Sequence, residues 1–149
     1  MRASDKCLAL IRQFEGFKAS PYRCPAGVPT IGFGSTRYAD GTHVNMTDPP
    51  ITEAQAEEIM RATLREYEDA VNRYVAVSLN QNEFDALVDF AYNAGAQNLR
   101  KSTLLAKLNA GDRKGAELEF ERWVFSNGKV LPGLVRRRFA EKALFGMPV

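Results

Sequence analysis

The stretch from Pro21 to Gly34 most constrains what this chain can fold into, because it cannot be helical. It carries three prolines and three glycines. A proline inside a helix lacks the N–H that the helix needs and clashes with the preceding turn. The segment YRCPAGVPTIGFGST therefore predicts two short strands around a turn.

A short amphipathic helix is expected before this hairpin. Ser4 is a suitable N-cap, Gly16 a suitable C-terminal stop, and apolar residues recur between them at helical spacing. Glu15 falls in the last turn of this helix. After the hairpin, ADGT at 39–42 marks a second turn, so we expect a third strand from His43 to Met46.

From Thr52 onward the pattern becomes helical. Thr52 and Gln55 form a capping box that opens a helix running to about Val75, well beyond the usual length of about 11–12 residues. A second capping box, Asn80 with Glu83, opens the next helix. Three more helices are expected: one capped by Ser102 and ending near Leu108, one opened by Asp112, and one over 134–145 after a break at SNGKVLPG.

The predicted fold class is α+β with two lobes. A small N-terminal lobe containing the β-hairpin (about 1–51) is joined by a long helix (52–79) to a larger all-helical lobe (80–149). No linker-like composition separates them, and 149 residues suffice to bury one core. We therefore expect a single domain over 1–149.

Composition narrows the function classes. No uncharged run is long enough for a membrane span or a signal-peptide core, so we expect the chain to be made in a cytoplasm. Cys7, Cys24 and a single histidine, His43, make neither a zinc pattern nor a Ser-His-Asp arrangement, and a reducing cytoplasm disfavours a Cys7–Cys24 disulfide. We expect no metal and no cofactor.

Charge is unevenly distributed along the chain. Residues 100–149 hold eleven Lys and Arg against five Asp and Glu, whereas residues 1–99 hold nine against thirteen. Such asymmetry is often found in a protein with an anionic partner, although charge alone favours a solvated basic face slightly.

Several motifs in unbroken order identify a family. FEGF, CPAG, TIGFGST, FAYNAGAQNLRKSTLL, LNAGD and GKVLPGLVRRRFAEKALF resemble the phage-type lysozymes of glycoside hydrolase family 24, the endolysins of tailed phages and prophages. The resemblance covers about residues 5–145. The family's signature is a Glu, an Asp or Cys nine residues later, and a Thr six beyond that, and Glu15, Cys24 and Thr30 meet both spacings.

The resemblance implies a lysozyme-like fold and a muramidase that cleaves the β-1,4 bond between N-acetylmuramic acid and N-acetylglucosamine in peptidoglycan, lysing the host cell. Glu15 would be the general acid, which needs a pKa raised by burial beside apolar groups to act near neutral pH. Thr30 would hold the attacking water on the opposite face of the sugar.

Cys24 departs from the aspartate form of the signature, and three uses of it stay open. It polarises the water as a weak base, or becomes a thiolate nucleophile, or only fills space while Thr30 handles the water. An unperturbed thiol is only about 3% ionised at pH 7. The stereochemistry is therefore not fixed by the sequence.

Further substrate contacts are expected at five positions. Gly32 and Gly34 leave the strand backbone open to close approach, Tyr92 and Asn93 are candidates to line the site, and Ser102 is a saccharide-contact candidate as well as a helix cap. Core positions are expected for the large aromatic residues Phe90, Trp123 and Phe125, and a core position is also the alternative for Tyr92. Of Arg136, Arg137 and Arg138, at least one is expected to face solvent and one to pair with Glu141.

The resemblance also implies a monomer with peptidoglycan as partner, no nucleic acid, and holin-dependent passage from the host cytoplasm to the periplasm and wall. Three rivals remain at this point. A glycan-binding module without activity would have no need of the Glu15–Thr30 spacing, a nucleic-acid binder would use the basic C-terminal half, and a lytic transglycosylase also needs only one acid.

Overall fold

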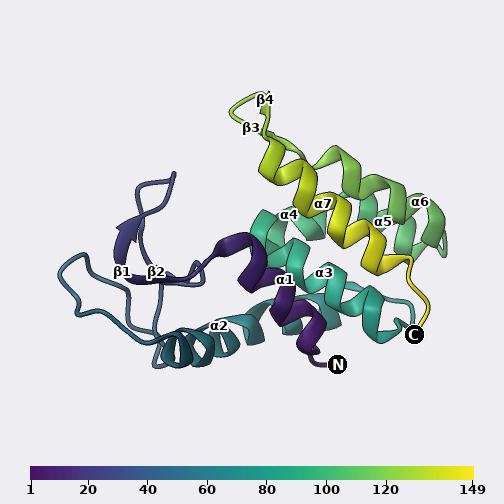
Figure 1. Cartoon of the computed structure of the whole chain (residues 1–149). Helices are drawn as coiled ribbons and strands as arrows, with labels where there is room; N and C mark the ends of the chain where they lie inside the picture. Colours follow the sequence, from purple (N-terminus) through teal and green to yellow (C-terminus); the bar gives the residue numbers. More distant parts are fainter. The chain divides into compact units, whose positions relative to one another are not determined.

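The computed structural model describes residues 1–149 and is a mixture of helices and two small antiparallel sheets (Figure 1). The elements in order are α1 (Asp5–Glu15), β1 (Lys18–Arg23), β2 (Pro29–Gly32), α2 (Glu53–Tyr74), α3 (Gln81–Ala94), α4 (Ala96–Lys101), α5 (Thr103–Asn109), α6 (Arg113–Glu119), the 3-10 turn η1 (Phe120–Arg122), β3 (Phe125–Ser126), β4 (Lys129–Val130) and α7 (Pro132–Phe145). The expected α+β class is confirmed.

The chain divides into two compact units. The smaller unit is Ile11–Glu66, and the larger unit combines Met1–Leu10 with Tyr67–Val149. The division falls within α1 and within α2, so each of these helices contributes residues to both units.

The smaller unit is organised by the β1–β2 hairpin. Ile31 and Phe33 are buried, as alternation along the strand predicts for its core face. After β2 the chain turns tightly through Gly32–Gly34, and Ile31 and Ser35 close this turn with two backbone hydrogen bonds of 2.8 and 3.0 Å. Other buried apolar residues of this unit are Ile11, Val44, Ala56, Ile59, Met60 and Leu64.

The third strand expected at His43–Met46 does not form, and that prediction is wrong. Arg37 and His43 make one isolated bridge around the predicted turn. The pairing stops because the Asn45 N–H is taken by the Asp48 carboxylate at 2.8 Å, which starts a separate turn. The turn signal was therefore correct and the strand was not.

Helix caps explain where the helices begin. Thr52 and Gln55 make the predicted capping box, with hydrogen bonds of 2.8 and 3.1 Å. Asn80 and Glu83 make the second, at 2.9 and 2.8 Å. These side chains satisfy N–H groups that the first helical turn leaves without partners.

The core of the larger unit lies between α3, α7 and the shorter helices, and α3 packs along α7 (Figure 1). Phe90 is fully buried, as predicted, and its ring meets Phe120 and Trp123 edge-on at 5.7 and 5.3 Å. Trp123 is only half-buried. Phe125 is 60% exposed, so its expected core position is wrong.

Phe125 is exposed because the segment SNGKVLPG forms structure of its own and does not only separate two helices. It forms the two-residue hairpin β3–β4, in which Phe125 pairs with Val130 and Asn127 takes a positive φ of 51°. Pro132 at the first helical position then starts α7 two residues earlier than expected. The short helix α4 was also not predicted from the sequence.

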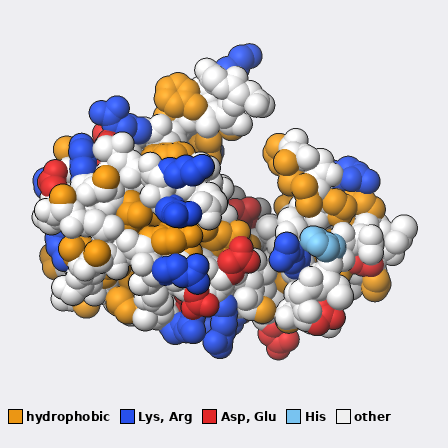
Figure 2. Space-filling model, turned by 180° about the vertical axis from the view of Figure 1, so that it is seen from behind, with side chains coloured by type: hydrophobic (Ala, Val, Ile, Leu, Met, Phe, Trp, Pro, Cys, Tyr) orange, Lys and Arg blue, Asp and Glu red, His pale blue; other side chains and the backbone are white.

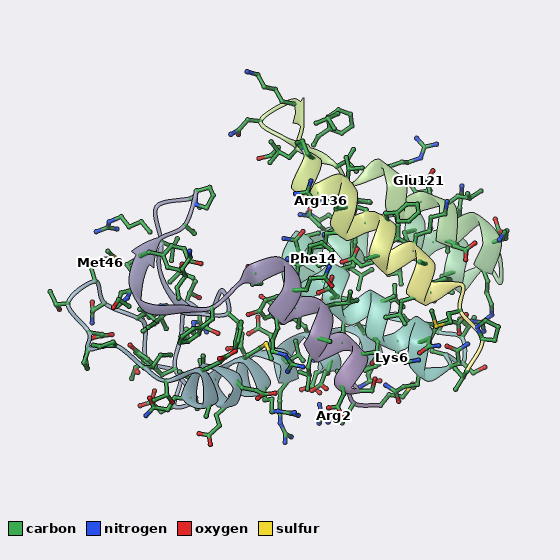
Figure 3. The ribbon with its side chains drawn as sticks, viewed as in Figure 1. Arg2, Lys6, Phe14, Met46, Glu121 and Arg136 are labelled. Carbon is green, nitrogen blue, oxygen red and sulfur yellow. The ribbon has the colours of Figure 1, made fainter.

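A buried ionic network joins α3 to α7 in the larger unit. Arg137 donates to the two carboxylate oxygens of Asp89 at 3.0 and 2.9 Å, and Arg138 pairs with Glu141 at 3.1 Å. Arg136, labelled in Figure 3, is exposed. The predicted division of the three arginines is confirmed.

Candidate active site

The β1–β2 hairpin places Cys24 and Thr30 on one face. Tyr22 lies directly opposite Thr30 in the register, and the ladder continues past the strand end with a 3.1 Å hydrogen bond from the Cys24 N–H to the Val28 carbonyl. Because side chains alternate along a strand, Tyr22, Cys24 and Thr30 share the same face.

Thr30 is almost completely buried, with 2% of its surface exposed. Its hydroxyl donates to the Val28 carbonyl at 2.8 Å. A hydroxyl has one proton and two lone pairs. In this arrangement Thr30 therefore offers its lone pairs to a further donor such as a water molecule.

Cys24 is half-buried in the turn that follows β1. A hydrogen bond from the Val28 backbone is the chief cause that lowers the pKa of the Cys24 thiol, helped by the Ala26 backbone and opposed by desolvation. Hydrogen bonds to an ionised group favour that form. The turn thus makes Cys24 a stronger acid than an ordinary cysteine. This raises its thiolate fraction, which brings it closer to the ionised aspartate found in the other form of the signature.

Glu15 is the last residue of α1, next to Phe14, which Figure 3 labels. The N–H of Gly16 closes the helix on the Arg12 carbonyl at 3.1 Å, with a φ of 70° that glycine adopts without strain. The carboxyl lies against Gly34: a Cβ added there would lie 2.7 Å from Oε1 of Glu15. The turn after β2 therefore holds the backbone directly against the predicted acid.

Gly32 has a different neighbour. A Cβ on this residue would meet the Cβ of Ala56 in α2 at 3.0 Å. Close packing of α2 is thus one reason for glycine at this position.

Tyr22 was not among the site residues predicted from the sequence. Its phenol pKa is raised above the ordinary value of 10, first by burial and then by the negative charges of Glu15 and Cys24. Tyr22 is therefore the residue whose ionisation responds to both groups. The signal available in the sequence was its i, i+2 spacing to Cys24, which puts both residues on one strand face.

The other three predicted contacts belong to the larger unit. Tyr92 is half-buried with its ring edge-on to Tyr67 at 5.4 Å, and the exposed Asn93 accepts a hydrogen bond from Arg138. Ser102 is buried and caps α5: its hydroxyl accepts from the Leu105 N–H at 3.0 Å and donates to the Leu99 carbonyl at 2.7 Å. The capping role predicted for Ser102 is confirmed.

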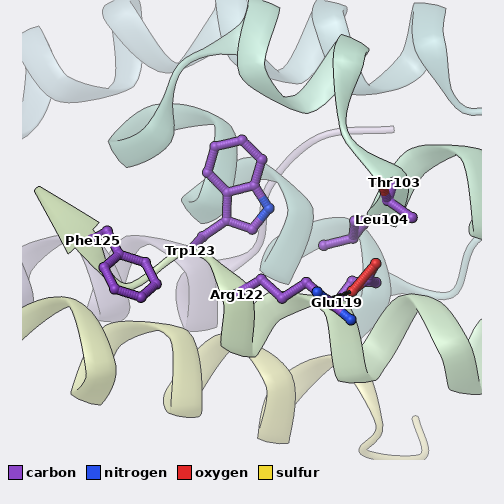
Figure 4. A pocket seen from close by; sticks show the side chains of 6 residues that line it. All are labelled: Thr103, Leu104, Glu119, Arg122, Trp123 and Phe125. Carbon is purple, nitrogen blue, oxygen red and sulfur yellow. Dashed lines mark ion pairs between the residues drawn. The ribbon is translucent and has the colours of Figure 1, made fainter. Parts of the chain in front are cut away.

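A pocket of about 390 Å³ lies in the larger unit (Figure 4). Trp123 and Phe125 form its aromatic side, and Arg122 is paired with Glu119 at its polar side. Thr103 and Leu104 complete the lining, next in sequence to Ser102. None of the six lining residues was predicted to contact substrate.

No three His, Cys, Asp or Glu side chains come together as they would to bind a metal ion. None of the helices combines the length and the apolar character that crossing a bilayer requires.

The chain is similar to known proteins over nearly its whole length. The family model described as phage lysozyme matches residues 12–141. The chain belongs to the phage lysozyme family. Its activity is accordingly that of a lysozyme, a hydrolase that degrades peptidoglycan and so lyses the host cell for phage release.

Individual members of the phage lysozyme family are similar over nearly the whole chain. An endolysin of Acyrthosiphon pisum secondary endosymbiont phage 1 is 42% identical, covering 97% of this chain and 98% of its own. An endolysin of Bacillus phage PZA is 43% identical over 97% of this chain, which spans only 55% of that longer protein.

Among solved structures, the endolysin of Escherichia coli O157:H7 phage FAHEc1 is 37% identical with a TM-score of 0.89, over 98% of this chain and 94% of that one. The lysozyme-like fold implied by the sequence motifs is confirmed.

Proposed function

We propose that the chain hydrolyses the β-1,4 bond between N-acetylmuramic acid and N-acetylglucosamine with Glu15, Cys24 and Thr30 as its catalytic residues. One observation carries the assignment: the hairpin and the turn after it gather all three within the smaller unit. Cys24 and Thr30 share the hairpin face, and Gly34, four residues after Thr30, abuts the Glu15 carboxyl.

The chemistry follows from these positions. Protonated Glu15 gives its proton to the glycosidic oxygen as the bond breaks through an oxocarbenium-like transition state. A water molecule donates one hydrogen to the lone pairs of Thr30, which directs the water oxygen at the anomeric carbon. The other water proton leaves to the Cys24 thiolate as the new C–O bond forms.

Cys24 acts as the base in this scheme. The backbone N–H groups that lower its pKa increase the thiolate fraction near neutral pH, and they also weaken the thiolate as a nucleophile. Both effects favour activation of water over formation of a covalent glycosyl intermediate. Attack by water on the face opposite the leaving group inverts the anomeric configuration.

The proposal also includes a single lysozyme-like domain over 1–149 and the further substrate contacts expected from the sequence. Gly34 presents its backbone close to Glu15, and Gly32, two residues before it, contacts the glycan through its own backbone in this proposal. Asn93 uses its amide oxygen to accept from Arg138, which directs its amide nitrogen to a substrate N-acetyl carbonyl, beside Tyr92. Ser102 contributes least, because its hydroxyl already serves the α5 cap.

Access to the wall completes the proposal. The protein accumulates as a monomer in the host cytoplasm and reaches the periplasm and the wall through a holin-type membrane lesion. Lys and Arg side chains gather on the larger unit in the face seen in Figure 2, and the chain holds eleven of its twenty Lys and Arg within residues 100–149. This positive charge steers the protein toward an anionic wall.

The decisive experiment combines a lysis assay with product analysis. Wild type should clear chloroform-treated Gram-negative cells, Glu15→Gln should not, and the exposed Glu53→Gln in the first turn of α2 should behave as wild type. Mass spectrometry of the released fragments should find reducing ends. Anhydro-muramic acid ends would assign a lytic transglycosylase, and clearing by Glu15→Gln would remove Glu15 from the mechanism.

A further inference from the structure

The phenol of Tyr22 shares the hairpin face on which the proposed catalytic residues lie. Tyr22 and Thr30 are directly opposite in the β1–β2 register, so their Cβ atoms are about 5 Å apart. Cys24 is two residues further along the same strand direction, and the 24–28 backbone hydrogen bond keeps the alternation intact to that point. Tyr22 is therefore a neighbour of both residues.

The acidic groups of Glu15, Tyr22 and Cys24 affect one another through their charges. The negative charges of Glu15 and Cys24 both raise the pKa of Tyr22, after burial, whereas the pKa of Cys24 is lowered. The thiol therefore ionises while the phenol still keeps its proton. The nearest cation on the strand, Arg23, lies on the opposite face and donates to the Gly27 carbonyl at 2.8 Å.

A phenol that stays protonated near anionic groups acts toward them as a hydrogen-bond donor. It donates its O–H to an ionised partner, and the ionised partner in turn keeps the phenol neutral.

We propose that Tyr22 is a positioning residue of this site, whose phenol O–H donates to the sulfur of Cys24 on the same hairpin face and stabilises the thiolate. This inference rests on the proposed function for its purpose, because the stabilised thiolate is the base that activates water. The hydrogen bond itself requires no substrate.

The test measures the Cys24 thiol directly, by its rate of alkylation with iodoacetamide from pH 5.5 to 10. Cys7 is fully buried, and burial raises the pKa of its thiol, so the folded protein is alkylated at Cys24, as peptide mapping verifies. Tyr22→Phe should move the midpoint of the alkylation profile up by about 0.7 pH unit, and the thiolate fraction at pH 7 should fall roughly fivefold, the effect of one lost hydrogen bond.

Tyr38→Phe is the matched control in the same unit. It removes a phenol that donates to Asp48 at 2.7 Å, and it should leave the midpoint unchanged. An unchanged midpoint in Tyr22→Phe, or an equal shift in both variants, overturns the proposal.

A second measurement does not depend on altering Tyr22. In protein labelled at the tyrosine Cζ carbon, NMR titration should place the Tyr22 pKa lower in Cys24→Ala and in Glu15→Gln than in wild type. Identical Tyr22 titrations in all three proteins would refute the coupling. Both measurements are made without glycan, so they are independent of whether Glu15→Gln still clears cells.

Discussion

The contact between Gly34 and Glu15 makes the most specific prediction about this site. In Gly34→Ala the new Cβ would start 2.7 Å from Oε1 and 3.1 Å from Cδ of Glu15. Carbon and oxygen atoms approach to about 3.3 Å without strain, so the carboxyl must retreat by roughly 0.6 Å. A displacement of about 1 Å at a reacting group costs up to about a hundredfold in rate, and we expect a loss of about tenfold or more.

Backbone strain must be separated from this effect. Gly34 has a φ of 83°, where a Cβ costs roughly 1–2 kcal/mol. Gly41 has a φ of 87° and nothing within 4 Å of an added Cβ. Gly41→Ala therefore carries the same strain without touching Glu15, and both variants should lose several degrees of Tm, at about 2–4 °C per kcal/mol.

Initial rates of clearing of chloroform-treated cells should distinguish the two variants at a temperature where both are folded. Gly41→Ala should keep its wild-type rate, and Gly34→Ala should lose about tenfold or more. Equal rates in the two variants would mean that the position of Glu15 is not set by the turn after β2.

Three further predictions concern charge. Cys24→Asp should stay active and Cys24→Ala should lose most of its activity. From pH 7 to pH 5 the activity of Cys24→Asp should rise relative to that of wild type, because a carboxylate stays ionised where the thiolate takes up its proton. Parallel pH–activity profiles would exclude Cys24 as the base. Arg137→Ala leaves the buried Asp89 without its two hydrogen bonds and should lower the free energy of unfolding by about 3–5 kcal/mol, whereas the exposed Arg136→Ala should change it by less than about 0.5 kcal/mol in denaturant titrations. Burial and the neighbouring Asp89 raise the pKa of Glu141 above its ordinary 4.5, so the stabilisation from Glu141 is complete below pH 4.5 and is lost as the pH rises. The free energy of unfolding of wild type minus that of Glu141→Gln should therefore fall from pH 4 to pH 8. A constant difference would contradict the raised pKa.

Local signals in the sequence predicted the elements that depend on neighbouring residues. Prolines and glycines determined the β1–β2 hairpin, and the capping boxes at Thr52 and Asn80 determined where α2 and α3 begin. The strand expected at His43–Met46 failed because the Asn45 N–H found a closer partner in Asp48. Phe125 was expected in the core because large aromatics usually bury, but its two-residue hairpin carries it into solvent.

The sequence by itself determined the residue types of the site and their spacing: an acid at the end of a helix, then a thiol and a hydroxyl on a hairpin. Only the tertiary structure decided that Gly34 lies against the Glu15 carboxyl, that backbone N–H groups lower the pKa of Cys24, and that Tyr22 responds to both. The physical reason is that spacing along a strand fixes which face a side chain occupies, whereas charge and close contact depend on atoms brought together by folding. The pKa of Cys24 depends on hydrogen bonds from the backbone of its turn, and the order of residues in the sequence does not reveal them.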